Sequence, residues 1–246
     1  MAYDDRSGAK IGVLVPYTNT NLEPDLRLLC PPGATVHAAR LGGYDVEEIP
    51  GAEQMAGLGA ASLDEPLRLI AGVRPDVVLY GCTSATLTHG PDFDRDLAAK
   101  IKAVADAVSI TAAGALIAGI KALGLRRVGF ASPYLGEIND QAVAFLEAEG
   151  IRTVLCADIG RPLGNYGQGE LTPEEVYQLA LRADHQDAEA IVLSCTDMRA
   201  LEVQDQLESR LDKPVITSNQ AMVFCLMRAL GLSRHEAAVG RLFAHL

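Results

Sequence analysis

Two short segments of the sequence place a cysteine and a threonine one residue after an apolar, β-branched run. Cys82 and Thr83 follow "PDVVLY", and Cys195 and Thr196 follow "AEAIVL". Such runs are typical of strands in parallel sheets, which bind ligands beyond the carboxyl ends of their strands. A helix that begins there offers free amides that stabilise a thiolate, which predicts thiol pKa values below the usual ~8.5. The sequence therefore predicts a catalytic pair, Cys82 and Cys195.

Two thiols that face each other can act on opposite sides of one carbon centre. One, as the thiolate, takes a proton or attacks carbon, while the other, as the thiol, delivers a proton from the opposite face. Cys30, Cys156 and Cys225 lack equivalent positions, and we interpret them as packing residues. An odd number of cysteines, five, and no recognisable export signal favour reduced thiols and a cytoplasmic location.

Hydroxyl side chains near both cysteines suit a small carboxylate as the ligand. They come from Thr83, Ser84, Thr86 and Thr196. Together with free amides at a helix start, hydroxyls bind an anion without a formal positive charge. This matters because the chain carries a net charge of −11, so that local donors must overcome an unfavourable long-range field.

Four further residues are candidates for the same cleft. Asn19 follows the first predicted strand, as either a turn former or a cleft residue. Tyr134 follows the equivalent strand of the second half and offers a phenol. Asn165 lies in "GRPLGNYGQGE", whose length suggests a lid or binding loop. For Arg199, an ion pair with Glu202 or Glu170 is favoured over contact with a substrate.

Composition excludes several classes of function. The charge of −11 argues against nucleic acid or an anionic membrane as a partner, and no run is long enough to span a bilayer. The five histidines are dispersed, and the chain has neither CxxC nor HExxH, so we expect no metal site.

Short apolar runs alternate with helical patterns, which predicts βαβ units, a mainly parallel sheet and an α/β fold. One helix has a complete start signal, with Thr172 as N-cap, Pro173 next and Glu175 closing a capping box. The predicted strands are Ile11–Val15, Thr35–Ala39, Asp76–Tyr80, Val128–Ala131, Thr153–Ala157, Ala190–Leu193 and Pro214–Thr217.

The chain also repeats itself. "VSITAAGALIAGIKALGL" aligns without a gap with "VITSNQAMVFCLMRALGL", and "IGVLVPY" matches "VGFASPY". We therefore predict two similar Rossmann-like lobes related by a pseudo-twofold axis, with the active site in the cleft between them. The predicted lobes comprise residues 1–113 and 114–218, with the C-terminal helix 219–246 completing the first lobe.

Five segments together resemble the Asp/Glu racemase superfamily, and within it the maleate cis–trans isomerases, over nearly the whole chain. They are "VPYTNTNLEPD", "LYGCTSAT", "FASPYLGEIN", the loop that contains Asn165, and "LSCTDMRALE". The resemblance implies two racemase-type lobes, a homodimer, no cofactor and no metal. It also implies active-site positions at Asn19, Cys82, Tyr134, Asn165 and Cys195.

By the same resemblance, the Cys82 thiolate adds to C2 of maleate, and the former double bond rotates in a succinyl-like adduct before elimination releases fumarate. Cys195 serves as proton donor and acceptor.

Two alternatives remain within the superfamily. Amino-acid racemases carry Cys-Asn-Thr where this chain has Cys-Thr-Ser, and arylmalonate decarboxylases keep only the second cysteine. A third alternative is a non-catalytic protein that binds a small acid.

Overall fold

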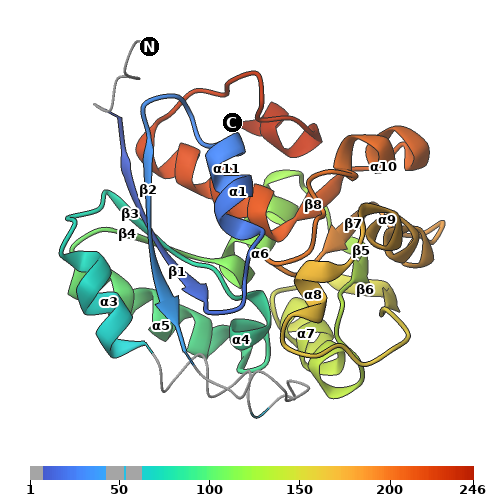
Figure 1. Ribbon diagram of the computed structural model, residues 1–246. Coiled ribbons are helices and arrows are strands. Elements are labelled where there is room, and N and C mark those ends of the chain that lie inside the picture. Colours follow the sequence, from blue (N-terminus) through green and yellow to red (C-terminus); the bar gives the residue numbers. More distant parts are fainter. Residues whose placement is uncertain (1–7, 43–52, 54–62) are drawn as a thin grey trace.

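The computed structural model describes residues 8–42, 53 and 63–246 of the chain (Figure 1). Its framework is a pair of four-stranded sheets in which every neighbouring pair of strands is parallel. The first sheet has the order β2 (Thr35–Leu41), β1 (Lys10–Pro16), β3 (Val77–Tyr80) and β4 (Val108–Thr111). The second has the same order, β6 (Arg152–Ala157), β5 (Arg127–Ala131), β7 (Ala190–Leu193) and β8 (Val215–Thr217). The predicted fold class, two similar α/β lobes with parallel sheets, is confirmed.

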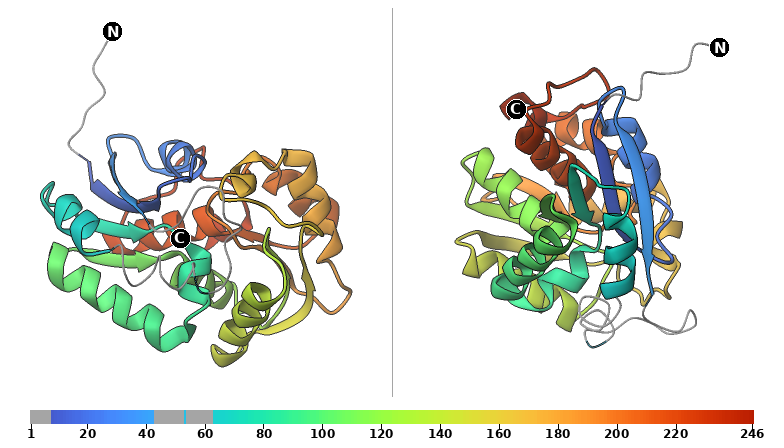
Figure 2. Two further views of the ribbon diagram at one scale, coloured as in Figure 1. Left: turned by 60° about the horizontal axis from the view of Figure 1, so that its bottom comes forward. Right: turned by 90° about the vertical axis from the view of Figure 1, so that its left-hand side faces the viewer.

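Helices connect the strands and cover both faces of each sheet. They are α1 (Leu22–Leu29), α3 (Asp64–Ala71), α4 (Thr83–Leu87), α5 (Gly90–Ala105), α6 (Ala112–Ala122), α7 (Glu137–Ala148), α8 (Gly167–Glu170), α9 (Pro173–Arg182), α10 (Gln204–Leu211), α11 (Ser218–Leu230) and the 3-10 helix η1 (Arg241–His245). In the left view of Figure 2, the blue and teal elements around the first sheet lie opposite the yellow and orange elements around the second.

Every strand predicted from the sequence is present, but the prediction missed β4. This strand has only four residues and is half-buried over its first two, so its apolar signal is short. The repeat nevertheless contained it, because the alignment sets Ile110 and Thr111 against Ile216 and Thr217 of β8. The internal repeat was therefore a stronger signal here than local hydrophobicity.

Alternating side chains divide the core into three layers. Val13 faces the central cluster between the two sheets, whereas Leu14 faces α3 and α5 on the outer side of the first sheet. In the second sheet, Val192 faces the central cluster and Ile191 faces α9 and α10. All four side chains are fully buried, and each such burial stabilises the fold by about 1.5–3 kcal/mol.

Two equivalent helices, α6 and α11, pack against each other and against both β4 and β8. Each begins directly after a strand that ends in Ile-Thr, and each threonine caps its helix. Thr111 Oγ1 accepts from the Gly114 amide at 3.0 Å, and Thr217 Oγ1 accepts from the Gln220 amide at 3.1 Å. Helix α11 also contacts α1, which connects β1 and β2 of the first sheet. The lobe boundaries given above stay a prediction.

The capping box at the start of α9 is confirmed. Thr172 Oγ1 accepts from the Glu175 amide at 3.3 Å, and the Glu175 carboxylate accepts from the Thr172 amide at 2.9 Å. None of the helices that the structure describes is long and apolar enough to cross a membrane.

Candidate active site

A small cavity lies where the inner strands of both sheets end, beyond β1, β3, β5 and β7. Its volume is about 30 Å³, far below the ~300–1,000 Å³ of ordinary ligand pockets, so its lining groups lie close together. It is lined by Pro16, Thr18, Asn19, Cys82, Thr83, Tyr134, Asn165, Gln168, Cys195, Thr196 and Asp197. A larger surface groove of about 880 Å³ runs between β2 and α3. Because that groove contains neither cysteine, we place the candidate site at the smaller cavity.

The structure brings the sequence-predicted residues together. Seven of them line the cavity, and these are all buried except the half-buried Tyr134; Ser84, Thr86 and Arg199 are not part of the lining. Ser84 lies beside it, and its hydroxyl donates to Tyr134 Oη at 3.2 Å. Thr86 does not reach the cavity, because its hydroxyl donates to the Thr83 carbonyl at 3.0 Å.

The turn that carries Cys82 joins β3 directly to α4. Cys82 is the residue before the first turn of that helix, and its sulfur lies 3.7 Å from Ser84 Oγ. A side chain on the preceding Gly81 would place its Cβ 2.3 Å from Leu22 Cδ2, so a larger residue here would force Leu22 of α1 to move. Thr83 Oγ1 donates to Ser218 Oγ at 3.0 Å, which ties this turn to the start of α11.

The turn that carries Cys195 differs from the prediction. A helix was expected directly after it, but the chain forms turns up to residue 203, and α10 begins at Gln204. The Asp197 amide donates to Cys195 Sγ at 3.4 Å, and the hydroxyl of Tyr134 lies 3.9 Å from the same sulfur. Arg199 is half-buried and pairs with Glu202 at 2.6 Å, which supports the structural role favoured for it.

The prediction of thiol pKa values below ~8.5 is wrong for both cysteines of the resting protein. Burial raises the pKa of the Cys82 thiol above its ordinary value. Burial also raises the pKa of Cys195 to about 12, and the nearby Asp197 carboxylate adds to the effect. Desolvation of a thiolate outweighs the few amides of the five-residue α4, and Cys195 has no helix start at all. Both thiols therefore rest in their protonated form.

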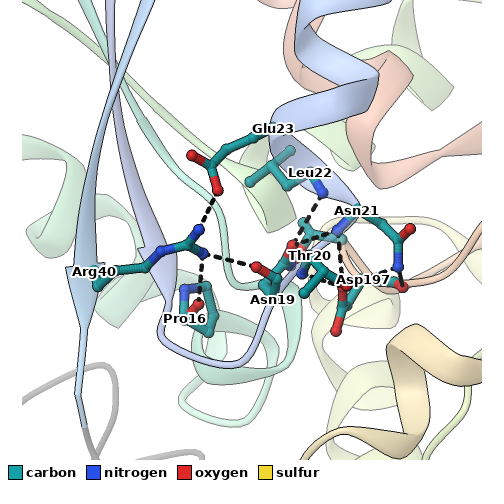
Figure 3. Close-up of polar contacts among 9 residues, drawn as sticks. Pro16, Asn19, Thr20, Asn21, Leu22, Glu23, Arg40 and Asp197 are labelled. Atoms are coloured by element: carbon teal, nitrogen blue, oxygen red, sulfur yellow. Dashed lines mark hydrogen bonds and ion pairs between the residues drawn. The ribbon is translucent and has the colours of Figure 1, made fainter.

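Asn19 joins the two cysteine turns. Its Nδ2 donates to Thr196 Oγ1 at 3.1 Å, and that hydroxyl donates to the Gly81 carbonyl at 2.8 Å. Its Oδ1 accepts from the amides of Asn21 at 3.2 Å and Leu22 at 3.0 Å (Figure 3). Both interpretations of Asn19 therefore hold, because one side chain shapes the turn before α1 and lines the cavity.

Arg40 holds the same loop from the side of β2 (Figure 3). Its guanidinium donates to the Asn19 carbonyl at 2.7 Å and to the Pro16 carbonyl at 3.4 Å, and it forms an ion pair with Glu23. The guanidinium of Arg40 thus binds the side of the loop that faces away from the cavity, and Arg40 is not among the residues that line the cavity.

Sequence reasoning missed Asp197 as a functional residue. This carboxyl is only 7% exposed and lines the cavity. Its Oδ1 accepts from the Thr20 amide at 2.8 Å and from the amide and Nδ2 of Asn21, both at 3.1 Å (Figure 3). Burial raises its pKa to about 6, against the lowering effect of these hydrogen bonds. The available signal was an acidic residue two positions after Cys195.

The loop that contains Asn165 reaches the cavity from the second half. Asn165 and Gln168 are both buried, and Gly169 packs so tightly on Asp197 that a Cβ there would lie 2.8 Å from its Oδ2. Asn21 Nδ2 lies within hydrogen-bond distance, 3.3 Å, of the Gly169 carbonyl. This loop and the loop after β1 therefore meet over Asp197.

The chain is similar to known proteins over almost its whole length. The arylmalonate decarboxylase family matches it over residues 11–243. The chain belongs to this family. The resemblance seen in the sequence is thereby confirmed.

The relatives of this chain include maleate isomerases and an arylmalonate decarboxylase. Maleate isomerase of Nocardia farcinica is 29% identical over 95% of this chain and 94% of its own length. Arylmalonate decarboxylase of Bordetella bronchiseptica is 28% identical over 94% of this chain and 91% of its own length.

Solved structures of family members have the same fold. The maleate isomerase of Pseudomonas putida S16 matches with a TM-score of 0.86 at 26% identity, over 96% of this chain and 98% of its own. A mutant of the Nocardia farcinica maleate cis–trans isomerase with a covalently bound succinylcysteine intermediate matches with a TM-score of 0.86 at 25% identity, over 96% and 98%.

The lining of this family member's cavity sets what it can bind. Its donors are amides and hydroxyls, and among the described lining residues there is no lysine, arginine or histidine. Within the described part of the chain, no three His, Cys, Asp or Glu side chains are grouped so that they could hold a metal ion. The arrangement therefore suits a small polar molecule held by hydrogen bonds between two thiols.

Proposed function

We propose that this protein is a cofactor-independent isomerase that converts maleate, or a closely related small unsaturated dicarboxylate, to the trans isomer. The observation that carries the proposal is that Cys82 and Cys195, one from each half, line a single cavity. Four relatives that are similar over nearly the full length of this chain are maleate isomerases. The mutant structure of the Nocardia farcinica enzyme contains a covalent succinylcysteine. A thioether of that kind is the product expected from addition of a thiolate to maleate.

The proposed reaction has four steps. The Cys82 thiolate adds to C2 of maleate, and the electron pair of the double bond moves to C3, which takes the proton of the Cys195 thiol. The C2–C3 bond, now single, rotates. The Cys195 thiolate then removes a proton from C3 as the C2–S bond breaks, which regenerates the Cys82 thiolate and releases fumarate.

Because both thiols rest protonated, only a small fraction of Cys82 is thiolate at neutral pH. Addition to the substrate proceeds from this fraction. A thiol with a raised pKa is also a stronger nucleophile once ionised. A high pKa equally suits Cys195, which holds a proton at neutral pH and can deliver it to carbon.

Neutral donors hold the two carboxylates in this proposal. They are Asn19, Thr83, Ser84, Tyr134, Asn165 and Thr196, together with the amides that follow both cysteines. A ligand carboxylate would replace contacts that these groups now make with each other, such as the 3.1 Å bond between Asn19 and Thr196.

Proton NMR of the reduced protein with maleate in D₂O, with a chelator present, tests the proposal. We expect the vinyl signal of maleate to decline as that of fumarate grows, and Cys82→Ala to abolish the change. The exposed thiol variant Cys156→Ser is the matched control and should turn over like the wild type. A maleate signal that stays constant under all conditions would overturn the proposal.

Decarboxylation of an arylmalonate is a second candidate, because the matching family carries that name and one relative is such an enzyme. Phenylmalonate in the same NMR assay separates the two candidates, since decarboxylation gives phenylacetate and leaves maleate untouched.

Two coarser predictions accompany the proposed reaction. We propose a homodimer, which light scattering coupled to size-exclusion chromatography would test, and a cytoplasmic location, which fractionation of the producing cell would test. Neither is needed for the chemistry, because one chain supplies both cysteines.

A further inference from the structure

Among the described residues that line the cavity, Asp197 is the only acid, and there is no lysine, arginine or histidine. Both thiols rest neutral, so its carboxylate is the charge that an entering anion meets first. A dicarboxylate brings two further negative charges into a buried space. Like charges at close range in such a site cannot all remain ionised without a large electrostatic cost.

The two oxygens of Asp197 have different surroundings. Oδ1 accepts three hydrogen bonds, from the Thr20 amide and from both nitrogens of Asn21. No described protein group donates to Oδ2, which lies next to the Cα of Gly169. Oδ1 is thus saturated with donors, and a proton on this carboxyl belongs on Oδ2.

Charged groups on the neighbouring elements act on the Asp197 carboxylate. Arg40, on β2, is the favourable cation, but Glu23 shares its guanidinium. Asp25 on α1 is the acid that interacts with Asp197, and it also interacts with Glu202, in the turn before α10, whose partner is Arg199. Glu170, on α8, is exposed. With its pKa raised to about 6 by burial, the free carboxyl is ionised at neutral pH, though not by a wide margin.

We propose that Asp197 takes up one proton from solvent when a dicarboxylate binds, and that the neutral acid then donates a hydrogen bond from Oδ2 to a carboxylate of the ligand. No bond to carbon forms or breaks in this step, and the proton returns to solvent when the ligand leaves. The inference rests on the proposed function for its class of ligand. It makes Asp197 a binding residue that selects dianions by exchanging a repulsion for a hydrogen bond.

The sign of the pH dependence follows directly. Above a pH of about 6 the free protein must gain a proton to bind, so affinity for a dianion falls about tenfold per pH unit. Below that pH Asp197 is already protonated in the free protein, and the dependence from this group disappears. The cysteines contribute nothing here, because they are protonated in the free protein throughout this range.

Calorimetric titration with succinate tests the inference, because succinate has the two carboxylates but no double bond to react. At about pH 7.5 succinate is a dianion, so any proton taken up enters the protein. Titrations in phosphate and in Tris, whose ionisation enthalpies differ, give the number of protons bound. We expect close to one proton per succinate for the wild type, and none for Asp197→Asn, whose affinity should be nearly independent of pH.

Asp25→Asn is the matched control, since Asp25 is a half-buried acid whose pKa desolvation also raises to about 6, but it does not line the cavity. It should retain the wild-type proton uptake. Succinate binding without proton uptake by the wild type, or uptake that persists in Asp197→Asn, would overturn the inference. So would a wild type that binds no succinate at any pH between about 5.5 and about 8.

The wild-type titration needs no variant to fold, and it separates this inference from the proposed reaction. Turnover of maleate with no proton uptake on succinate binding would leave the proposed function standing and remove the role of Asp197. Proton uptake on succinate binding with no turnover of maleate would do the reverse.

Discussion

The two cysteine turns occupy equivalent places after β3 and β7, yet their surroundings differ. Cys82 leads directly into α4, and its sulfur lies 3.7 Å from the hydroxyl of Ser84. Cys195 leads into an open turn, where the Asp197 amide and the Tyr134 phenol lie 3.4 Å and 3.9 Å from its sulfur. The duplicated fold sets where the thiols are, and the side chains beside each sulfur give it its own task. A sulfur beside a neutral hydroxyl suits a covalent adduct, whereas one beside an acid and a phenol suits proton exchange.

The largest expected effect comes from breaking either side of this comparison. Cys82→Ser and Cys195→Ser should each lower kcat/KM for maleate by at least about 10³-fold, since paired catalytic groups act as a unit. The two variants should differ in what they accumulate. Cys195→Ser incubated with maleate should carry one maleate-derived mass on the peptide that contains Cys82, because solvent can slowly protonate C3 of the adduct whereas a serine hydroxyl cannot remove a proton from it again. Cys82→Ser should carry none.

Intact-mass and peptide mass spectrometry measure this difference. Cys156→Ser controls for unspecific addition, because Cys156 is the exposed cysteine of the chain. An adduct on Cys195, or equal modification of both variants, would show that the two thiols are interchangeable.

Removal of the Tyr134 hydroxyl should have the next largest effect. This phenol accepts from Ser84 at 3.2 Å and lies 3.9 Å from Cys195, so it connects the surroundings of the two sulfurs. Tyr134→Phe should lower kcat/KM by about 10²-fold, the usual effect of one well-placed donor. Tyr177→Phe, on the half-buried face of α9, is the control and should leave the rate unchanged. Steady-state kinetics with maleate measures both, and equal rates for the two variants would contradict a role for Tyr134.

The fold was predictable because its signals are local or repeated. The β-branched runs marked most strands, and the paired segments that end in Ala-Leu-Gly-Leu revealed the duplication. The same segments contain Ile110 and Thr111, so the repeat held the strand that hydrophobicity alone missed.

The site was predictable in position but not in electrostatics. Any residue just past a parallel strand reaches the same edge, so Asn19, Cys82 and Cys195 could be placed without a structure. Their pKa values depend on how completely the two halves close over them, which no local pattern encodes. Asp197 escaped notice for a similar reason. The amides that donate to its buried carboxylate come from Thr20 and Asn21, which are remote in sequence.

A smaller effect should come from buried polar residues that differ between the halves. Asp94, on α5, lies beside the start of α6 and is 7% exposed, whereas the buried Gln204 of the second half is neutral and donates to the Val215 carbonyl at 2.9 Å. Burial raises the pKa of Asp94 to about 6 from the ordinary 3.8. Since the folded-state pKa is the higher one, this group lowers stability as pH rises from about 4 to about 6, and the loss is complete above that.

Asp94→Asn should therefore raise the free energy of unfolding by about 1–3 kcal/mol at about pH 8, and by much less at about pH 4. Urea denaturation at both pH values measures the change. The exposed Asp96, on the same helix, offers the control Asp96→Asn, which should alter stability little at either pH. A gain for Asp94→Asn of the same size at both pH values would show that shape, and not ionisation, is responsible.

The smallest effect should distinguish the helix starts of α9 and α3. Helix α9 begins with the Thr172–Glu175 capping box, whereas α3 begins after Leu63, whose side chain makes no cap hydrogen bond. Thr172→Ala should lower the free energy of unfolding by about 1 kcal/mol and leave kcat/KM unchanged, and Thr172→Ser should retain the wild-type stability. Thermal and urea denaturation measure both variants. If Thr172→Ala were as stable as the wild type, the start of α9 would be held by the burial of Val176 and Leu179 alone, and the two halves would not differ at this point.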